Sequence, residues 1–241
     1  MSVLTDSRHT GSWNGALKAV TFSYDDGVRQ DGRLIELFDK YGVRGTFNLN
    51  SGLMGRRDDI TKNGVTVGHE KFTPEEAKRV YEGHEIAVHT VTHPNLTEVT
   101  AEEVLTQVED DRAALSALAG YDIQGMAYPG GGVNSSPEIA DIIKNGTPLR
   151  YARTTVPSYD FEPQSDLYLF KPTLHHTEFD KLFELGRKFI DLKPDSPKIF
   201  YIWGHSYEFD FDDSWALFED FLRDISGKDD IFYGTNSQTL L

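Results

Sequence analysis

The chain has 241 residues, of which 38% are hydrophobic and 26% charged. This composition can bury the core of one large α/β domain and excludes wholesale disorder. The formal net charge of -15 would repel nucleic-acid phosphates and anionic lipid headgroups, so we expect neither nucleic acid nor a membrane as a partner. The absence of cysteine excludes disulfides, thiolate metal sites and cysteine nucleophiles.

Two features of the sequence bear on location and domain organisation. No apolar run approaches the roughly 18–20 residues of a membrane span, and residues 1–15 lack an apolar stretch of signal-peptide length. If Met1 is the natural start, we expect a cytoplasmic protein. We predict a single domain over residues 1–241, with an N-terminal extension at 1–15. Residues 50–71 are rich in Gly, Asn and charge, which predicts a surface insertion.

Strand-like and helix-like segments alternate along the chain. Periodicity and capping signals predict strands at residues 18–24, 45–49, 85–88, 125–128, 151–155, 198–203 and 231–233. They predict helices at residues 31–41, 73–83, 100–119, 136–144, 179–192 and 212–225. About seven strand–loop–helix units favour a parallel sheet that closes into a barrel with outer helices.

In such barrels the chemistry lies on the loops after the strands, and the first of these carries two acidic residues. Asp25 and Asp26 follow a strand and precede Gly27. A turn at this point can aim both carboxylates into one cleft, where one would bind a metal and the other take a proton. An Asp-Asp-Gly sequence that only turns the chain is the structural alternative.

Two histidines follow the strand at residues 85–88. His89 and His93 are four residues apart, and on a helical turn this spacing puts both imidazoles on one face. Together with a carboxylate from Asp25 or Asp26 they form a ligand set typical of catalytic zinc. Two ordinary loop histidines remain the alternative.

A third histidine and a glycine-rich turn follow later strands. His205 comes after the most hydrophobic strand, where partial desolvation can tune it as a general acid or base, although a structural histidine is the alternative. Gly130 follows Tyr128 and Pro129, and its backbone N–H can approach a substrate oxygen closely. Among the remaining histidines, the adjacent pair His175 and His176 fits a surface position best. His9, His69 and His84 have no partner pattern.

Together these motifs resemble the polysaccharide deacetylase family, carbohydrate esterase family 4. The resemblance rests on the Asp-Asp-Gly strand at residues 21–27 and the histidine motif at 89–93. A partial glycine motif at 127–131 and the strand ending in histidine at 202–205 support it. The match extends from Lys18 to His205, and it implies a distorted (β/α)7 barrel and a single catalytic domain over the whole chain.

The resemblance also implies the roles of individual residues. Asp26, His89 and His93 would hold one divalent metal, with zinc the expected ion. Asp25 would be the general base and His205 the general acid. The substrate and its oxyanion would be held by Gly130, with Tyr128 and Arg153 as further contacts.

Two positions depart from the family pattern. The arginine that orients the base would align with Ala127, and Arg153 is a substitute, although a surface ion pair would explain it equally well. No Asp-x-x-Asp-Trp motif supports His205, since Asp160 lies in the expected region without the tryptophan.

The leading hypothesis is a metal-dependent hydrolase that removes N-acetyl groups from an amino sugar or short oligosaccharide. One alternative keeps the barrel and hydrolyses another linear or cyclic amide, as in allantoinase-like relatives. Another is a catalytically inert carbohydrate-binding barrel. The sequence does not decide the oligomeric state, and a homo-oligomer is among the assemblies it permits.

Overall fold

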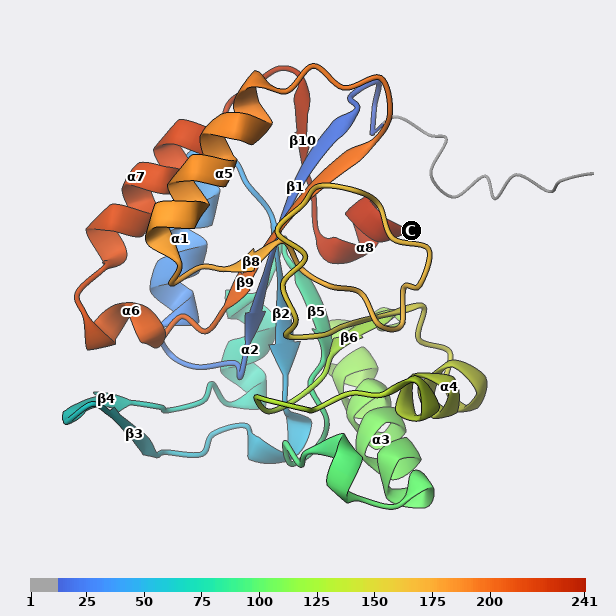
Figure 1. Cartoon of the computed structure of the whole chain (residues 1–241). Helices are drawn as coiled ribbons and strands as arrows, with labels where there is room; N and C mark the ends of the chain where they lie inside the picture. The colour runs from blue at the N-terminus through green and yellow to red at the C-terminus, as the bar shows by residue number, and fades with distance from the viewer. Residues whose placement is uncertain (1–12) are drawn as a thin grey trace, which may run out of the picture.

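The structure is a computed structural model that describes residues 13–241, so most of the predicted extension at 1–15 lies outside the described residues. It contains one large, mainly parallel sheet covered by helices (Figure 1). The strands of this sheet are β1 (Lys18–Asp25), β2 (Gly45–Leu49), β5 (Glu85–Val88), β6 (Gly125–Ala127), β7 (Tyr151–Arg153), β8 (Leu174–His175), β9 (Lys198–Gly204) and β10 (Ile231–Tyr233). The helices are α1 (Asp31–Tyr41), α2 (Pro74–Val80), α3 (Ala101–Ala119), α4 (Pro137–Gly146), α5 (Phe179–Asp191), α6 (Glu208–Phe211), α7 (Trp215–Ile225) and α8 (Asn236–Leu240).

The strand order confirms the predicted barrel-type fold. The sheet runs β7-β6-β5-β2-β1-β9-β8, and every neighbouring pair is parallel. The strand β10 pairs in parallel with the first half of β1, while β2 pairs with its second half. Beyond β7, a parallel bridge between Arg153 and Phe170 continues the curvature of this partial barrel.

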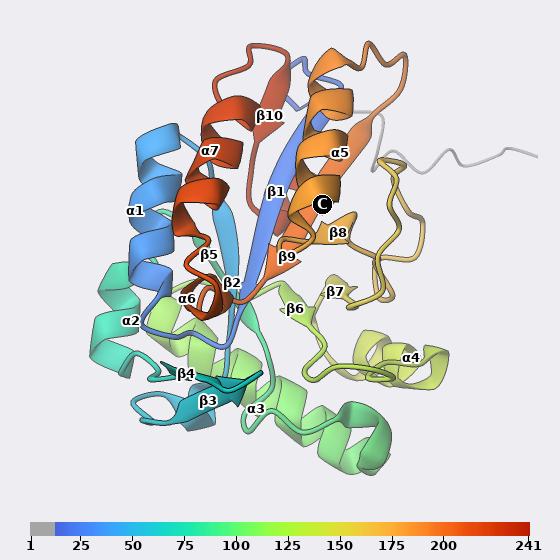
Figure 2. The same cartoon turned by 60° about the vertical axis from the view of Figure 1, so that its left-hand side comes forward.

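Successive side chains of the central strands point to opposite faces of the sheet and so belong to two separate hydrophobic clusters. Phe200 and Ile202 of β9 belong to the large cluster that includes the inward faces of the helices. Tyr201 and Trp203, one residue further along each time, belong to a smaller cluster on the other face of the sheet. Figure 2 shows α1, α5 and α7 on the face that the large cluster fills.

The segment at residues 50–71 is only partly a surface insertion. It forms an exposed antiparallel hairpin of β3 (Asp59–Lys62) and β4 (Val65–Gly68). Its two ends, Asn50 and Lys71, are buried against the main sheet. The segment therefore returns to the core just where β1 and β2 end.

The elements that the sequence did not predict are short. They are the β3–β4 hairpin, the two-residue strand β8, the helices α6 and α8, and the short 3-10 helices η2 (Ser51–Leu53) and η3 (Leu96–Glu98). None is long enough to show a clear hydrophobic period. Over residues 13–241, no helix combines the length and the apolar character that a membrane crossing requires.

Candidate metal and catalytic site

The carboxyl ends of β1, β5, β7 and β9 bring five of the predicted site residues to one end of the sheet. Asp25 ends β1, His89 follows β5, Arg153 ends β7 and His205 follows β9, while Asp26 begins the turn after β1. Parallel strands share this edge, so residues far apart in sequence meet there. In Figure 1 the arrowheads of β1 and β2 point to the end that carries the β3–β4 hairpin.

Asp25 and Asp26 point to different partners because Asp26 leaves the strand conformation. Asp26 has a φ of 81°, a left-handed value that is uncommon outside glycine. Its backbone N–H still donates to Asn48 O at 3.0 Å, so the turn begins while the chain is held on β2. The side chain of Asn48 donates to Asp25 Oδ1 at 2.8 Å. Asn48 thus anchors the Asp25 carboxylate and the Asp26 backbone at the same strand end.

Arg153 forms a buried ion pair with Asp25. The Nη2 atom of Arg153 lies 2.6 Å from Asp25 Oδ1 and 2.5 Å from Oδ2, and the arginine side chain has no exposed surface. The guanidinium also lies over the ring of Trp203, 4.3 Å from its centroid. Burial opposes ionisation of Asp25, but the cationic partners, Arg153 first, hold its pKa below the ordinary value. The surface ion pair considered from the sequence does not occur.

His89 has its tautomer set by the backbone. Its Nδ1 lies 2.9 Å from the carbonyl oxygen of Ala127, which can only accept, so Nδ1 carries the proton. The unprotonated Nε2 faces the site, 3.9 Å from Asp25 Oδ2. Burial lowers the pKa of His89 to about 4, so the ring is neutral at neutral pH.

His93 reaches the site from a loop, so the helical turn on which this spacing would align the two imidazoles does not form at residues 89–93. Thr90 and His93 both have left-handed φ values, 69° and 62°. The chain folds back on itself, and the two histidine rings lie 4.9 Å apart. His93 Nε2 is 3.6 Å from Asp26 Oδ1. A left-handed backbone conformation costs free energy in a residue other than glycine, and such residues cluster at functional sites. Three of them, Asp26, Thr90 and His93, lie at this site.

The Asp26, His89 and His93 side chains offer a donor set that fits a divalent metal. One ligand atom from each lies within 4.8 Å of the others. Burial lowers the pKa of His93 as well as that of His89, so both imidazoles present lone pairs. Burial alone would raise the pKa of Asp26, but the hydrogen bond from His69 and the charge of Lys71 keep it well below the ordinary value. Two neutral imidazoles and one carboxylate are a common catalytic zinc set.

Two residues of the 50–71 segment that the sequence analysis did not assign to the site lie against Asp26. His69 Nε2 is 3.3 Å from Asp26 Oδ2. Lys71 Nζ donates to the Asp26 carbonyl oxygen at 2.6 Å and lies 3.4 Å from Oδ1. The sequence of this segment, rich in Gly and charge, did not indicate that His69 and Lys71 contact Asp26. The contact depends on the β3–β4 hairpin, which turns the chain back toward the end of β1.

Glu208 supports His205, a role that the sequence analysis could not assign. Its Oε2 lies 3.2 Å from His205 Nδ1 and accepts from the His205 backbone N–H at 3.1 Å. Burial lowers the pKa of His205, but Glu208, Asp26 and Asp25 outweigh it and raise the pKa to about 9. His205 Nε2 faces Asp25 Oδ2 at 3.9 Å. Asp160, the candidate in the sequence, lies on an exposed loop.

His175 and His176 are not a surface pair. Their Nε2 atoms each lie 3.1 Å from Glu208 Oε2, and His176 is fully buried.

The glycine-rich turn after β6 presents Gly130 with a φ of 82° and open space around it. Asn134 fixes the turn by donating from Nδ2 to Gly130 O at 2.7 Å. The Tyr128 side chain is fully buried, and its hydroxyl donates to Tyr168 O at 2.9 Å. The turn therefore offers backbone rather than the tyrosine ring to a ligand.

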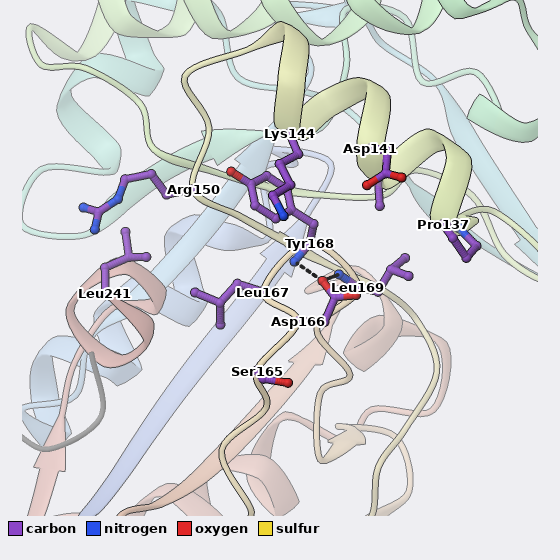
Figure 3. Close-up of a pocket in the computed structure, with 11 residues that line it drawn as sticks. Pro137, Asp141, Lys144, Arg150, Ser165, Asp166, Leu167, Tyr168, Leu169 and Leu241 are labelled. Carbon is purple, nitrogen blue, oxygen red and sulfur yellow. Dashed lines mark hydrogen bonds between the residues drawn. The ribbon is translucent and has the colours of Figure 1, made fainter. Parts of the chain in front are cut away.

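A separate pocket of about 490 Å³ lies between α4 and the loop at residues 165–169 (Figure 3). Lys144, Arg150, Asp141 and Asp166 line it, and none of these belongs to the carboxylate–histidine cluster. The chemistry of the site therefore does not lie in this pocket.

Carboxylates and histidines gather at the strand ends of a parallel partial barrel, the edge at which (β/α) barrels carry their functional sites. The chain belongs to the polysaccharide deacetylase family, since the family model described as polysaccharide deacetylase matches residues 14–145, more than half of the chain. Over 113 residues it is 30% identical to a peptidoglycan-N-acetylglucosamine deacetylase of Bacillus cereus, which covers 46% of this chain and 35% of that protein. The chain spans 35% or less of the length of the two sequence relatives that it matches.

Solved structures agree on the fold. A family 4 carbohydrate esterase from Streptomyces lividans, in complex with acetate, has a TM-score of 0.57 at 13% identity over 93% of this chain and 94% of that one. A family 4 pseudoenzyme from Bacillus anthracis has a TM-score of 0.53 at 14% identity over 93% of this chain and 66% of that one. The fold is thus shared by active and inactive proteins, so activity must be argued from the site.

The Arg153–Asp25 pair generates a stability prediction. Arg153→Met should lower the free energy of unfolding by about 3–5 kcal/mol, because it leaves a buried carboxylate without its cation. Urea unfolding at pH 7 measures this loss. In an Asp25→Asn background the same change should cost much less. Equal costs in both backgrounds would show that the two side chains are not coupled.

Proposed function

We propose that this protein is a metal-dependent hydrolase that removes N-acetyl groups from an amino sugar or a short oligosaccharide. The observation that carries the proposal is that a set of metal-type ligands and a pair of acid–base residues meet at the carboxyl-terminal end of the same sheet. Asp26, His89 and His93 form a metal-type donor set. Asp25 and His205 lie beside it, with His205 Nε2 3.9 Å from Asp25 Oδ2.

The proposed metal is one divalent ion, zinc by the chemistry of its donors, held by Asp26, His89 and His93. When bound, it supplies a Lewis acid that polarises the acetamide carbonyl and lowers the pKa of water. His69 and Lys71 hold Asp26 from the outside, so the carboxylate keeps its orientation whether or not a cation is present.

The protein residues perform the proton transfers in this proposal. Asp25, ionised and oriented by Arg153, takes a proton from the attacking water. Gly130 offers its backbone N–H to the developing oxyanion. His205, protonated at neutral pH because of Glu208, gives its proton to the departing amine. The products are acetate and a free amino sugar.

The site supports this proposal over an inert barrel. A carbohydrate-binding protein without turnover would need neither a buried base with a dedicated cation nor a histidine held protonated beside it. The name of the Bacillus cereus relative favours an N-acetylated sugar over a cyclic amide.

The metal ligands give the first test. The double substitution His89→Ala, His93→Ala should abolish tight zinc retention, because only one of the three ligands remains. Elemental analysis after gel filtration with a competing chelator measures the retained metal. His84→Gln, at the opposite end of β5, is the matched control and should retain zinc like the wild type. Equal zinc content in the double variant and the wild type would refute the site.

Asp25 gives the second test. Asp25→Asn keeps the shape of the side chain and removes its basicity, so the variant should retain zinc and lose about 10²–10⁴-fold in turnover. Deacetylation of an acetylated chitooligosaccharide, or of another substrate that the wild type turns over, measures the rate. Circular dichroism checks that the variant is folded. A rate close to that of the wild type would exclude Asp25 as the base.

His205 gives the third test. His205→Ala should lose far more turnover on an acetamide than on an acetyl ester with a good leaving group, because only the amine needs a proton to depart. Glu208→Gln should show the same selectivity, with a larger loss on the amide than on the ester, since it removes the charge that keeps His205 protonated. An equal loss on amide and ester in His205→Ala would argue against the general-acid role.

A further inference from the structure

A second histidine–carboxylate cluster lies on the outer side of His205. It combines His175 at the end of β8, His205 after β9 and Glu208 at the start of α6. One ligand atom from each lies within 4.8 Å of the other two. Glu208 Oε2 is 3.1 Å from His175 Nε2 and 3.2 Å from His205 Nδ1.

These separations suit a bound cation. Bonds of about 2.0–2.1 Å from a tetrahedral zinc ion place neighbouring ligand atoms about 3.3 Å apart. His175 Nδ1 accepts from the Thr177 backbone N–H at 3.3 Å and lies 2.8 Å from Thr177 Oγ1, so Nε2 carries the proton in the metal-free chain. Zinc binding would release this proton and take its place between Nε2 and Glu208. Two imidazoles and one glutamate are again a zinc-type donor set.

A buried neighbour provides an independent indication of a cation. His176 is fully buried, and its Nδ1 is hydrogen-bonded to Tyr24 Oη at 2.9 Å. Its Nε2 lies 3.1 Å from Glu208 Oε2 but makes no hydrogen bond there or elsewhere among the described residues. Three imidazoles thus converge on one carboxylate oxygen, more than it can accept with good geometry.

The charge balance and exposure of the cluster also suit a small cation. Over residues 13–241, the ion pairs of Glu208 go only to histidines, so no lysine or arginine neutralises it. The side chains of His175, His205 and Glu208 remain 19%, 20% and 12% exposed. A hydrated ion can therefore reach the cluster from solvent.

We propose that His175, His205 and Glu208 form a second divalent-metal site, suited to Zn²⁺ and separate from the Asp26, His89 and His93 site. Binding here engages His205 through Nδ1 and keeps its ring from carrying the additional proton that the leaving amine needs. Excess zinc therefore inhibits turnover. This consequence rests on the proposed function, whereas the binding itself does not.

The test is a titration of the metal-free full chain with Zn²⁺ against a chelating indicator at neutral pH. The wild type should bind two equivalents, the second more weakly. His175→Ala should retain the first equivalent and weaken the second by more than about 100-fold, since losing a ligand exceeds the 10–100-fold cost of losing an outer partner. His93→Ala should show the opposite pattern, and His84→Gln should bind both equivalents. His175→Gln repeats the test with a polar side chain if the alanine variant is unstable.

Turnover provides the second measurement. Zinc beyond one equivalent should inhibit deacetylation by the wild type, and His175→Ala should be active with one equivalent and resist the excess. A wild type that binds only one equivalent, lost in His93→Ala, overturns the second site and leaves the proposed function intact. Two equivalents that both persist in His175→Ala also overturn it. One equivalent that is lost in His175→Ala but kept in His93→Ala supports the second site and contradicts the proposed catalytic metal.

Discussion

The buried ion pair between Arg153 and Asp25 is the constraint on which the candidate site depends. A carboxylate at the end of the central strand would be strongly destabilised in this position without a cation. Arg153, from the distant strand β7, supplies that cation and stacks on Trp203 of β9. The pair therefore ties three strands together and keeps Asp25 ionised at the same time.

The second carboxylate, Asp26, is stabilised by a different part of the chain. The β3–β4 hairpin brings Lys71 to the backbone carbonyl of Asp26 and His69 to its carboxylate. Each acidic residue thus has its own cationic or hydrogen-bonding partner, and the two carboxylates can lie side by side without sharing a proton. This separation lets one bind a cation while the other handles protons, as the proposed function requires.

Glu208 makes His205 part of a larger polar network. The same carboxylate that raises the pKa of His205 also faces His175 and His176. In a low-dielectric setting such a network is strongly coupled, so a change at one histidine affects the others. The proposed second metal site and the proposed general acid share this glutamate. The arrangement that keeps His205 protonated would therefore also make it sensitive to divalent ions.

The sequence by itself determined the strand–helix order, the barrel class and the residues Asp25, Asp26, His89 and His205 at strand ends. These follow from local periodicity and from the rule that parallel strands share one functional edge. Only the tertiary structure decided the partners. Arg153, the 50–71 segment and Glu208 act through contacts across the sheet, and the loop at residues 89–93 adopts left-handed conformations that no helical spacing predicts. Local sequence patterns indicate which helix or strand a residue belongs to. The charge that stabilises a buried group comes from a segment distant in sequence, and only the folded structure shows which segment that is.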